Sequence, residues 1–399
     1  MPGILKKCSC CAAKLEHRRK LCGRCKTPYC GPACQKKHWE EGGHDKLCKK
    51  IKKGGGAELY NADKKYKEAV AAAAKKCAED TKGQTCYICM EAVHRRTGEG
   101  LVRGCACGDR DGVASGTTGI AHVSCLAEQA KILVAEAEEN NLDNKALNEK
   151  WDRWHTCSLC KQKYHGVVSC ALGWACWKTY LARPETDQFV DPAMGQLGAG
   201  LSDASQHEDA LSVREAELSM MLRLGASANN ILDKQNNIAC TYYKLKRFEQ
   251  ALRMRQDVYS GRLKLSGEEH YDTLIAANNC AHSLVDLRRF EEAKTLLRKN
   301  VLVARRVLGE SHITTLKMRW IYAEALYYDT GATLDDLREA ATTLEDVVRT
   351  ARRVLGGSHP LTPKFERALQ MARTVLGARE AGRSVVFRKP PNAAAPGSA

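Results

Sequence analysis

Between residues 86 and 160 the chain carries four closely spaced pairs of cysteine or histidine residues. The pairs are Cys86 and Cys89, Cys105 and Cys107, His122 and Cys125, and Cys157 and Cys160. This spacing lets two side chains from one loop bind one tetrahedral zinc ion, so eight ligands predict two zinc sites. The intervening sequence is rich in glycine and lacks apolar periodicity. We therefore expect metal rather than an apolar core to hold this span, because a structural zinc ion contributes on the order of 10 kcal/mol of coupled folding energy.

A second, separate series of eight ligands precedes the first. Its early pairs are spaced for a turn, and its later pairs are four residues apart, which places both side chains on one face of a short helix. Cys10 lies between two of these ligands and is interpreted as a spare thiol. Together the two series predict about four zinc ions per chain. The eight ligands are Cys8, Cys11, Cys22, Cys25, Cys30, Cys34, His44 and Cys48.

The first 53 residues resemble the MYND zinc finger. Beyond the ligands, the resemblance extends to Tyr29, Gln35 and the pair His38-Trp39. MYND fingers bind short peptide segments of partner proteins and catalyse no reaction, so residues 1–53 are predicted to be a recognition module in which His38 packs or forms hydrogen bonds. The resemblance implies one zinc ion on Cys8, Cys11, Cys30 and Cys34 and another on Cys22, Cys25, His44 and Cys48.

Residues 81–168 resemble the RING-CH (RINGv) finger. The order of the ligand pairs, the single residue Ala106 inside the second pair and the apolar run into His122 carry the resemblance. The sequence departs from that family in the long gap before His122, in an acidic helical insertion (residues 126–154) and in lacking membrane helices. The resemblance implies one zinc ion on Cys86, Cys89, His122 and Cys125 and another on Cys105, Cys107, Cys157 and Cys160.

RING-CH domains act as ubiquitin ligases by docking a ubiquitin-conjugating enzyme, and the resemblance implies the residues that would do so here. Ile88 lies inside the first knuckle, and Leu159, with Trp151 or Trp154, lies near the last. Lys161 follows the final ligand and would steady ubiquitin. No residue of such a ligase attacks the substrate, because proximity supplies the rate, so no catalytic residue is expected. The alternative is an adaptor that only assembles partners.

Three other interpretations of the cysteines are less favoured by the sequence. A PHD finger shares the ligand order, but the one-residue gap at Ala106 argues against it. A catalytic cysteine is disfavoured because every well-placed thiol is better explained as a ligand. Cys170 and Cys176, with His165, could form a further site, but thiols in an aromatic helix are more often core. We expect residues 54–80 to be a spacer helix and residues 169–200 a connecting helix.

From residue 201 to 380 the chain repeats itself. Lys246–Ala251 returns as Arg288–Ala293, and Gly267–His270 returns as Gly309–His312, each after 42 residues. Self-similarity at this length, with apolar residues at helical spacing, predicts paired helices stacked into a solenoid. Residues 329–335 are an insertion in the last copy. The tail, residues 381–399, is expected to be disordered.

The repeats resemble the kinesin light chain type of tetratricopeptide repeat (TPR), which implies a protein-binding scaffold. Asn236 and Asn278 begin Asn-Asn pairs at the position that faces the inner groove in that type, whereas the third copy has Trp320-Ile321 there. Each Asn is predicted to bind a peptide backbone, and the alternative is that it only satisfies helix-end backbone groups.

Composition places the chain among intracellular proteins, cytoplasmic or nuclear. Eighteen of the twenty cysteines precede residue 180 in metal-type spacing, and no apolar segment suits a signal peptide or membrane span. The net charge of +16 arises mainly in residues 1–76, with twenty basic and seven acidic side chains. Nucleic-acid binding is disfavoured because no helix interleaves base-reading side chains. The predicted fold is mostly α, with two small zinc-stabilised N-terminal modules followed by an α-helical TPR-like solenoid.

Overall fold

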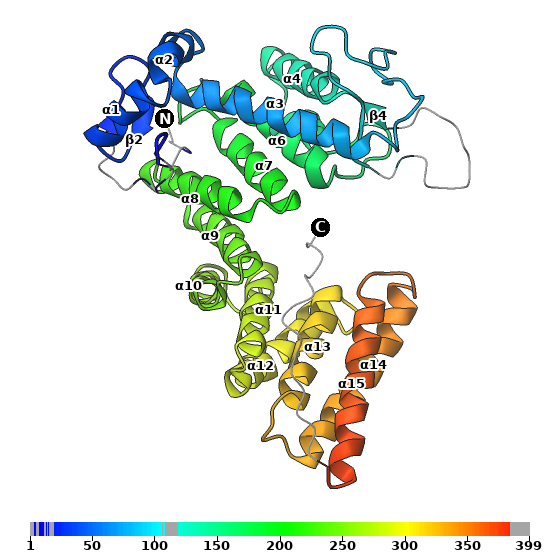
Figure 1. Ribbon diagram of the computed structural model, residues 1–399. Coiled ribbons are helices and arrows are strands. Elements are labelled where there is room, and N and C mark those ends of the chain that lie inside the picture. Colours follow the sequence, from blue (N-terminus) through cyan, green and yellow to red (C-terminus); the bar gives the residue numbers. More distant parts are fainter. Residues whose placement is uncertain are drawn as a thin grey trace. The chain divides into compact units, whose positions relative to one another are not determined.

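The computed structural model describes residues 4, 8–11, 13, 15, 20–105, 107 and 119–383. The chain is mainly helical and divides into two compact units, residues 1–226 and 227–399 (Figure 1). The boundary falls after the first helix of the predicted repeat region. Most of the predicted disordered tail, from residue 384 onward, lies outside the described residues. Within the described ranges no helix has the length and apolar character needed to cross a membrane.

The first unit begins with a small module of two strands and two helices. Strands β1 (Lys20–Leu21) and β2 (Pro28–Tyr29) pair antiparallel. Helix α1 (Pro32–Glu40) starts at a proline, which is well suited to a first helical position because its missing N–H would have no intrahelical partner. Helix α2 (His44–Lys53) buries only His44, Cys48 and Ile51. Its other side chains are mostly lysines in water.

Helix α3 (Ala57–Cys77) covers the predicted spacer but is a core helix rather than a linker. Its buried face, which includes Ala62, Val70 and Ala73, packs along α6 (Gly166–Tyr180) (Figure 1). The Lys178 ammonium group bonds the Asp63 carboxylate at 2.9 Å across this contact. Alanine-rich sequence lets two helix backbones approach closely, so α3 serves as packing surface for the central module.

The predicted acidic insertion folds into regular helices. Strands β3 (Val102–Arg103) and β4 (Ile120–Ala121) pair antiparallel ahead of α4 (Val123–Glu139). Helix α5 (Asn144–Trp151) follows after a turn, capped by the Asp143 carboxylate, and the short 3-10 helix η1 (Asp152–Trp154) completes the segment. Leu126, Ala130 and Val134 of α4 are buried. The insertion is therefore part of the core of this unit.

The prediction of one connecting helix over residues 169–200 is wrong. The structure has two helices, α6 and α7 (Val190–Asp203), separated by a segment that contains Pro184, and α8 (His207–Arg223) follows. Helices α6 and α7 cross closely, because a Cβ atom on Gly200 would lie 2.5 Å from the Ser169 carbonyl oxygen. Glycine permits this backbone contact.

Replacement of that glycine provides a direct test of the crossing. Gly200→Ala should lower the free energy of unfolding of the first unit by about 1–3 kcal/mol, because the added methyl group overpacks a backbone contact. Gly377→Ala, in α15 (Thr362–Glu380), is the matched control, since no heavy atom lies within 4 Å of its Cβ position. Removing a helical glycine there should stabilise the second unit by about 0.5–1 kcal/mol. Thermal unfolding of both variants measures the difference, and equal destabilisation would contradict the close crossing.

Two of the apolar clusters in the first unit include residues of the central span, so the expectation that metal rather than an apolar core holds this span needs correction. One cluster joins Trp154, Trp177, Tyr180 and side chains of α7 and α8. The other places the buried cysteines of the central ligand series among apolar side chains of α3, β3, β4, α4 and α6. The apolar side chains of this second cluster come both from inside residues 86–160, on β3, β4 and α4, and from the flanking helices α3 and α6.

The second unit consists of antiparallel helix pairs, as the repeat predicts. Its helices are α9 (Ala228–Lys244), α10 (Phe248–Ser266), α11 (Tyr271–Asp286), α12 (Phe290–Leu308), α13 (Ile313–Tyr327), α14 (Leu334–Val354) and α15. The repeated Gly-x-x-His motif lies between one helix and the next, and its histidine caps α11 and α13. Gly267, Gly309 and Gly356 have φ of 80°, 89° and 83°. His270, His312 and His359 each accept a hydrogen bond at Nδ1, from a backbone N–H two residues on, at 3.2 Å.

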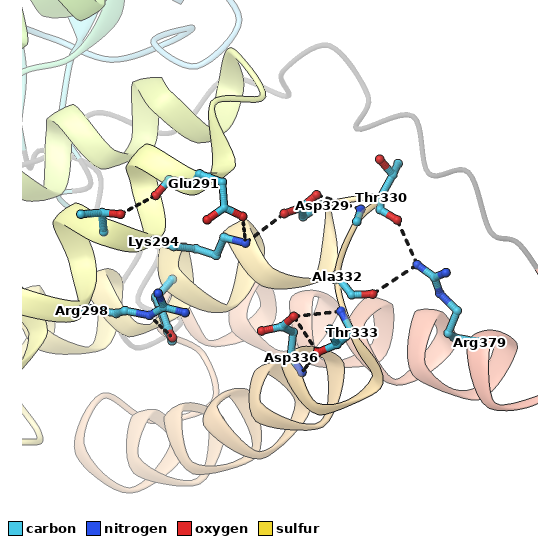
Figure 2. Close-up of polar contacts among 12 residues, drawn as sticks. Glu291, Lys294, Arg298, Asp329, Thr330, Ala332, Thr333, Asp336 and Arg379 are labelled. Atoms are coloured by element: carbon cyan, nitrogen blue, oxygen red, sulfur yellow. Dashed lines mark hydrogen bonds and ion pairs between the residues drawn. The ribbon is translucent and has the colours of Figure 1, made fainter.

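Charged side chains hold the insertion after α13, residues 329–335, in place through hydrogen bonds and ion pairs (Figure 2). Lys294 is nearly buried and its ammonium group bonds the Asp329 carboxylate at 2.9 Å. Arg379 donates to two carbonyl groups of the loop, and Thr333 with Asp336 forms a capping box at the start of α14. These contacts explain how the extra residues fit without disturbing the stacking of α13, α14 and α15.

Candidate metal centres

The structure brings the sixteen predicted ligands into four groups of four. Within each group the candidate ligand atoms all lie within 4.8 Å of one another. Each group could therefore hold a metal ion. The groups are Cys8, Cys11, Cys30 and Cys34; Cys22, Cys25, His44 and Cys48; Cys86, Cys89, His122 and Cys125; and Cys105, Cys107, Cys157 and Cys160.

In both modules the groups interleave along the chain, in the order that the two family resemblances imply. The first and third ligand pairs form one group, and the second and fourth pairs form the other. Because the pairs alternate along the chain, a metal ion in each group would cross-link two loops that are far apart in the sequence. Loss of either ion would then also loosen a loop that carries ligands of the other group. This arrangement suits a small module that has few backbone ladders of its own.

Three of the Cys-x-x-Cys turns share one backbone conformation. In each, the N–H of the first cysteine donates to the carbonyl five residues on, and that cysteine's carbonyl accepts from the N–H four residues on, at 2.8–3.0 Å. The residue after the second cysteine has a positive φ of 60–63°. This turn directs both thiols to one point, which is what binding a metal ion requires. The turns begin at Cys22, Cys86 and Cys157, with Lys26, Met90 and Lys161 at positive φ.

Each histidine turns one ring nitrogen into its group. Nε2 of His44 lies 3.4 Å from the Cys25 Sγ atom, and Nδ1 of His122 lies 3.3 Å from the Cys89 Sγ atom. Both rings are buried, and their other nitrogens have no hydrogen-bond partner within the part of the chain that the structure describes. His44 would therefore bind a metal ion through Nε2 and His122 through Nδ1. The spacing of ligands in the sequence does not reveal this difference.

The second central group is held tightly by its surroundings. The Sγ atoms of Cys107 and Cys157 are 3.6 Å apart. A hydrogen bond from the Cys105 thiol lowers the pKa of Cys157 to about 4 despite burial, and backbone N–H groups of its own turn lower it further. Gly119 has φ of 77°, and a Cβ atom there would lie 2.7 Å from the Cys105 Sγ atom. This group is thus built to hold a thiolate, the form that binds metal.

Ile88 and Leu159, the predicted docking residues, lie on two neighbouring turns. The Tyr87 hydroxyl group lies 3.0 Å from the Ser158 hydroxyl group, which joins the turn of the first central group to that of the second. Leu159 is 50 % exposed, and Ile88 is half-buried. Met90, 70 % exposed, extends the apolar surface beside them.

The two tryptophans predicted for docking are in the core instead. Trp154 is fully buried, and Trp151 stacks on Phe189 with ring centroids 5.5 Å apart. Both belong to the apolar cluster with Tyr180. Sequence proximity to the last ligand pair suggested the docking role, but the helical insertion turns these rings away from solvent.

The remaining predicted residues have simple placements. Lys161 is exposed at the end of its turn. Asn236 of α9 accepts a hydrogen bond from Asn279 of α11 at 3.4 Å, whereas the buried Oδ1 atom of Asn278 has no hydrogen-bond partner among the described residues. Cys170 and Cys176 are buried in α6, consistent with a core role.

Comparison with known proteins identifies the repeats. The tetratricopeptide repeat family model matches residues 231–272 and 273–314. No curated protein matches the chain. Tetratricopeptide arrays present extended binding surfaces, so the second unit is a scaffold for protein interaction.

Solved structures with similar helical repeats cover more than half of the chain at low identity. Two are forms of a Podosopora anserina protein described as a kinesin light chain with nearly identical TPR-like repeats. They share 17 % identity with this chain, at TM-scores of 0.40 and 0.39, covering 59 % and 58 % of it and 98 % and 97 % of themselves. The third is BtubC (BKLC) from P. vanneervenii, with 12 % identity, a TM-score of 0.36, and coverage of 69 % of this chain and 98 % of that one.

Proposed function

We propose that the protein is a zinc-dependent ubiquitin ligase of the RING-CH type that recruits other proteins through its tetratricopeptide repeats and its MYND-like module. The observation that carries the proposal is the pair of interleaved ligand groups between residues 86 and 160. Their two outer turns present Ile88 and Leu159 and are joined through Tyr87 and Ser158. An exposed apolar surface fixed by two metal centres suits a conjugating enzyme.

Zinc is the metal that the donor sets favour. Two groups offer four thiols, and two offer three thiols with one imidazole. Thiolate and imidazole ligands in sets of four suit tetrahedral Zn²⁺, whereas Ca²⁺ and Mg²⁺ require oxygen ligands. Four closed sets leave no position for a water molecule, so the proposed role of zinc is structural.

The proposed reaction needs no nucleophile on this chain. Ile88 and Leu159 would dock the conjugating enzyme, and Lys161 would contact ubiquitin from the adjacent position. The charged thioester would then lie close to a lysine of the recruited protein, and the resulting effective concentration supplies the rate. The repeats and the MYND-like module would choose the substrate.

An adaptor without ligase activity is the second candidate, and one observation favours it. Trp151 and Trp154 are packed in the core, so the docking surface lacks an exposed aromatic side chain beside its last turn. The docking surface is correspondingly small. The adaptor would use the same metal centres only to position its peptide-binding modules.

Autoubiquitination against a panel of conjugating enzymes separates the two candidates. Ile88→Ala should lower activity at least about tenfold, because truncating a central docking residue costs about 2 kcal/mol or more. Ile132→Ala is the matched control, since Ile132 is an exposed apolar residue of α4 outside the docking surface, and it should keep full activity. Cys157→Ser should abolish activity. A folded, zinc-loaded wild-type protein that is inactive with every conjugating enzyme would instead support the adaptor.

A further inference from the structure

The first helices of the later repeats change character along the solenoid. Counting from the histidine of each Gly-x-x-His motif, the fifth residue is Ile275 in α11, Lys317 in α13 and Lys364 in α15. The eighth residue is Asn278, Trp320 and Arg367 in the same order. One face of these successive helices is therefore uncharged in α11 and cationic in α13 and α15.

The cationic residues of α13 and α15 come together in the structure. Helix α13 packs directly against α15, and the rings of Trp320 and Phe365 meet edge to face with centroids 5.4 Å apart. Lys364 precedes Phe365, and Lys317 lies one turn before Trp320. Lys364 is close enough to Lys317 and Arg367 for their positive charges to lower its pKa.

No acidic side chain balances this group. Among the described residues, none of Lys317, Lys364 and Arg367 forms an ion pair, and the nearby acids pair elsewhere. Asp346 bonds Arg319, and Glu366 bonds Arg352. Burial lowers the pKa of Lys317. Burial also lowers the pKa of Lys364, and the charges of Arg367 and Lys317 lower it further. Lys317 and Lys364 are half-buried, whereas Arg367 is exposed and its Nε atom donates to the Pro363 carbonyl group at 3.2 Å. Half-buried cations without an acidic partner are costly, which marks a candidate functional site.

We propose that Lys317, Lys364 and Arg367 form a binding site for a phosphorylated side chain of a partner polypeptide. The proposal deepens, and rests on, the protein-recruiting role proposed for the repeats. Three cations lie near one another on two packed helices, which suits a compact dianion with three acceptor oxygens better than a row of separate carboxylates. The neighbouring face of α11, with Ile275 and Asn278, would contact the rest of the segment.

Titration of the full zinc-loaded chain with a labelled glycine–alanine peptide that carries a central phosphoserine tests the proposal. Fluorescence anisotropy should show saturable binding that inorganic phosphate competes away. Lys364→Met and Lys317→Met should each weaken binding about tenfold, since each removes one charge-assisted hydrogen bond. Lys264→Met is the matched control, because Lys264 is an exposed lysine of α10 that forms no ion pair with any residue the structure describes, and it should leave the affinity unchanged. Circular dichroism confirms that the variants remain folded.

Several results would overturn the site. Equal binding of the wild type and the Lys317→Met/Lys364→Met double variant would do so, as would equal binding of the serine and phosphoserine peptides. A glutamate peptide that binds as tightly as the phosphoserine peptide would exclude the phosphate assignment. If the double variant loses peptide binding but keeps autoubiquitination activity, the phosphate site is supported, and it is separate from the surface that docks the conjugating enzyme.

Discussion

Removing the metal ions with a strong chelator should open the metal-bound loops of the first unit and leave the second unit intact. Each structural zinc ion contributes on the order of 10 kcal/mol of coupled folding energy, which is comparable to the stability of a whole small domain. The ligand groups are confined to residues 8–160. Residues 227–383 contain none of them and have their own apolar clusters.

The apolar core of the first unit predicts which part of it survives. The cluster around Trp177, α7 and α8 contains no ligand cysteine, so those helices should remain formed. The other cluster includes five ligand cysteines and should loosen. Circular dichroism should therefore fall only modestly when the metal is removed, although the central module loses its shape.

Limited proteolysis with elemental analysis measures this outcome. The intact chain should contain about four zinc ions. After chelation, trypsin should cleave rapidly at Arg103, in β3, while Arg319, buried in α13, stays protected. Cys89→Ser should reproduce the cleavage without chelator, and Cys77→Ser, which removes a buried thiol outside the four groups, should not. Unchanged protection of Arg103 in a metal-free sample would refute the structural role of the metal.

The ligand groups were predictable because metal binding constrains spacing so strongly. Two thiols that bind one ion from one loop are separated by only one or two residues, as at Cys105 and Cys107 or at Cys86 and Cys89, whatever the rest of the chain does. Interleaving also followed from the family resemblances. The ring nitrogens of His44 and His122 did not, since they depend on the side from which each histidine enters its group.

The helical repeat could also be predicted from the sequence, for a different physical reason. A glycine at positive φ and a histidine cap recur because every helix pair must turn the same way, so the motif at Gly309 and His312 marks a turn wherever it appears. The sequence did not predict the charged contacts that pin the insertion. Lys294 and Asp329 are 35 residues apart, and nothing local pairs them.

The apolar packing of the central module was the main error. The apolar elements inside residues 86–160, namely β3, β4 and α4, complete their core only with α3 and α6, which lie on either side in the sequence. Single-segment patterns do not reveal a core assembled from flanking helices. The same omission assigned Trp151 and Trp154 to a docking surface.

Truncation of Trp154 should therefore act on stability and not on docking. Trp154 is fully buried, and its ring lies 6.0 Å from Tyr180 and 6.4 Å from Trp151, centroid to centroid. Trp154→Ala should lower the free energy of unfolding of the first unit by about 3–5 kcal/mol, the usual cost of a large aromatic side chain lost from a core. Leu159→Ala removes a half-exposed side chain five residues away and should change stability by less than about 0.5 kcal/mol.

Chemical denaturation, followed by the fluorescence of the first unit, separates the two substitutions. We expect the Leu159→Ala variant to keep full stability and to lose binding to the conjugating enzyme. At low denaturant, the Trp154→Ala molecules that remain folded should still bind the conjugating enzyme. A Trp154→Ala variant that is stable but no longer binds the conjugating enzyme would show that Trp154 contributes to docking after all. Trp154 is packed in the core and Leu159 lies on the exposed turn. We therefore expect substitution of Trp154 to lower stability without loss of binding, and substitution of Leu159 to lower binding without loss of stability.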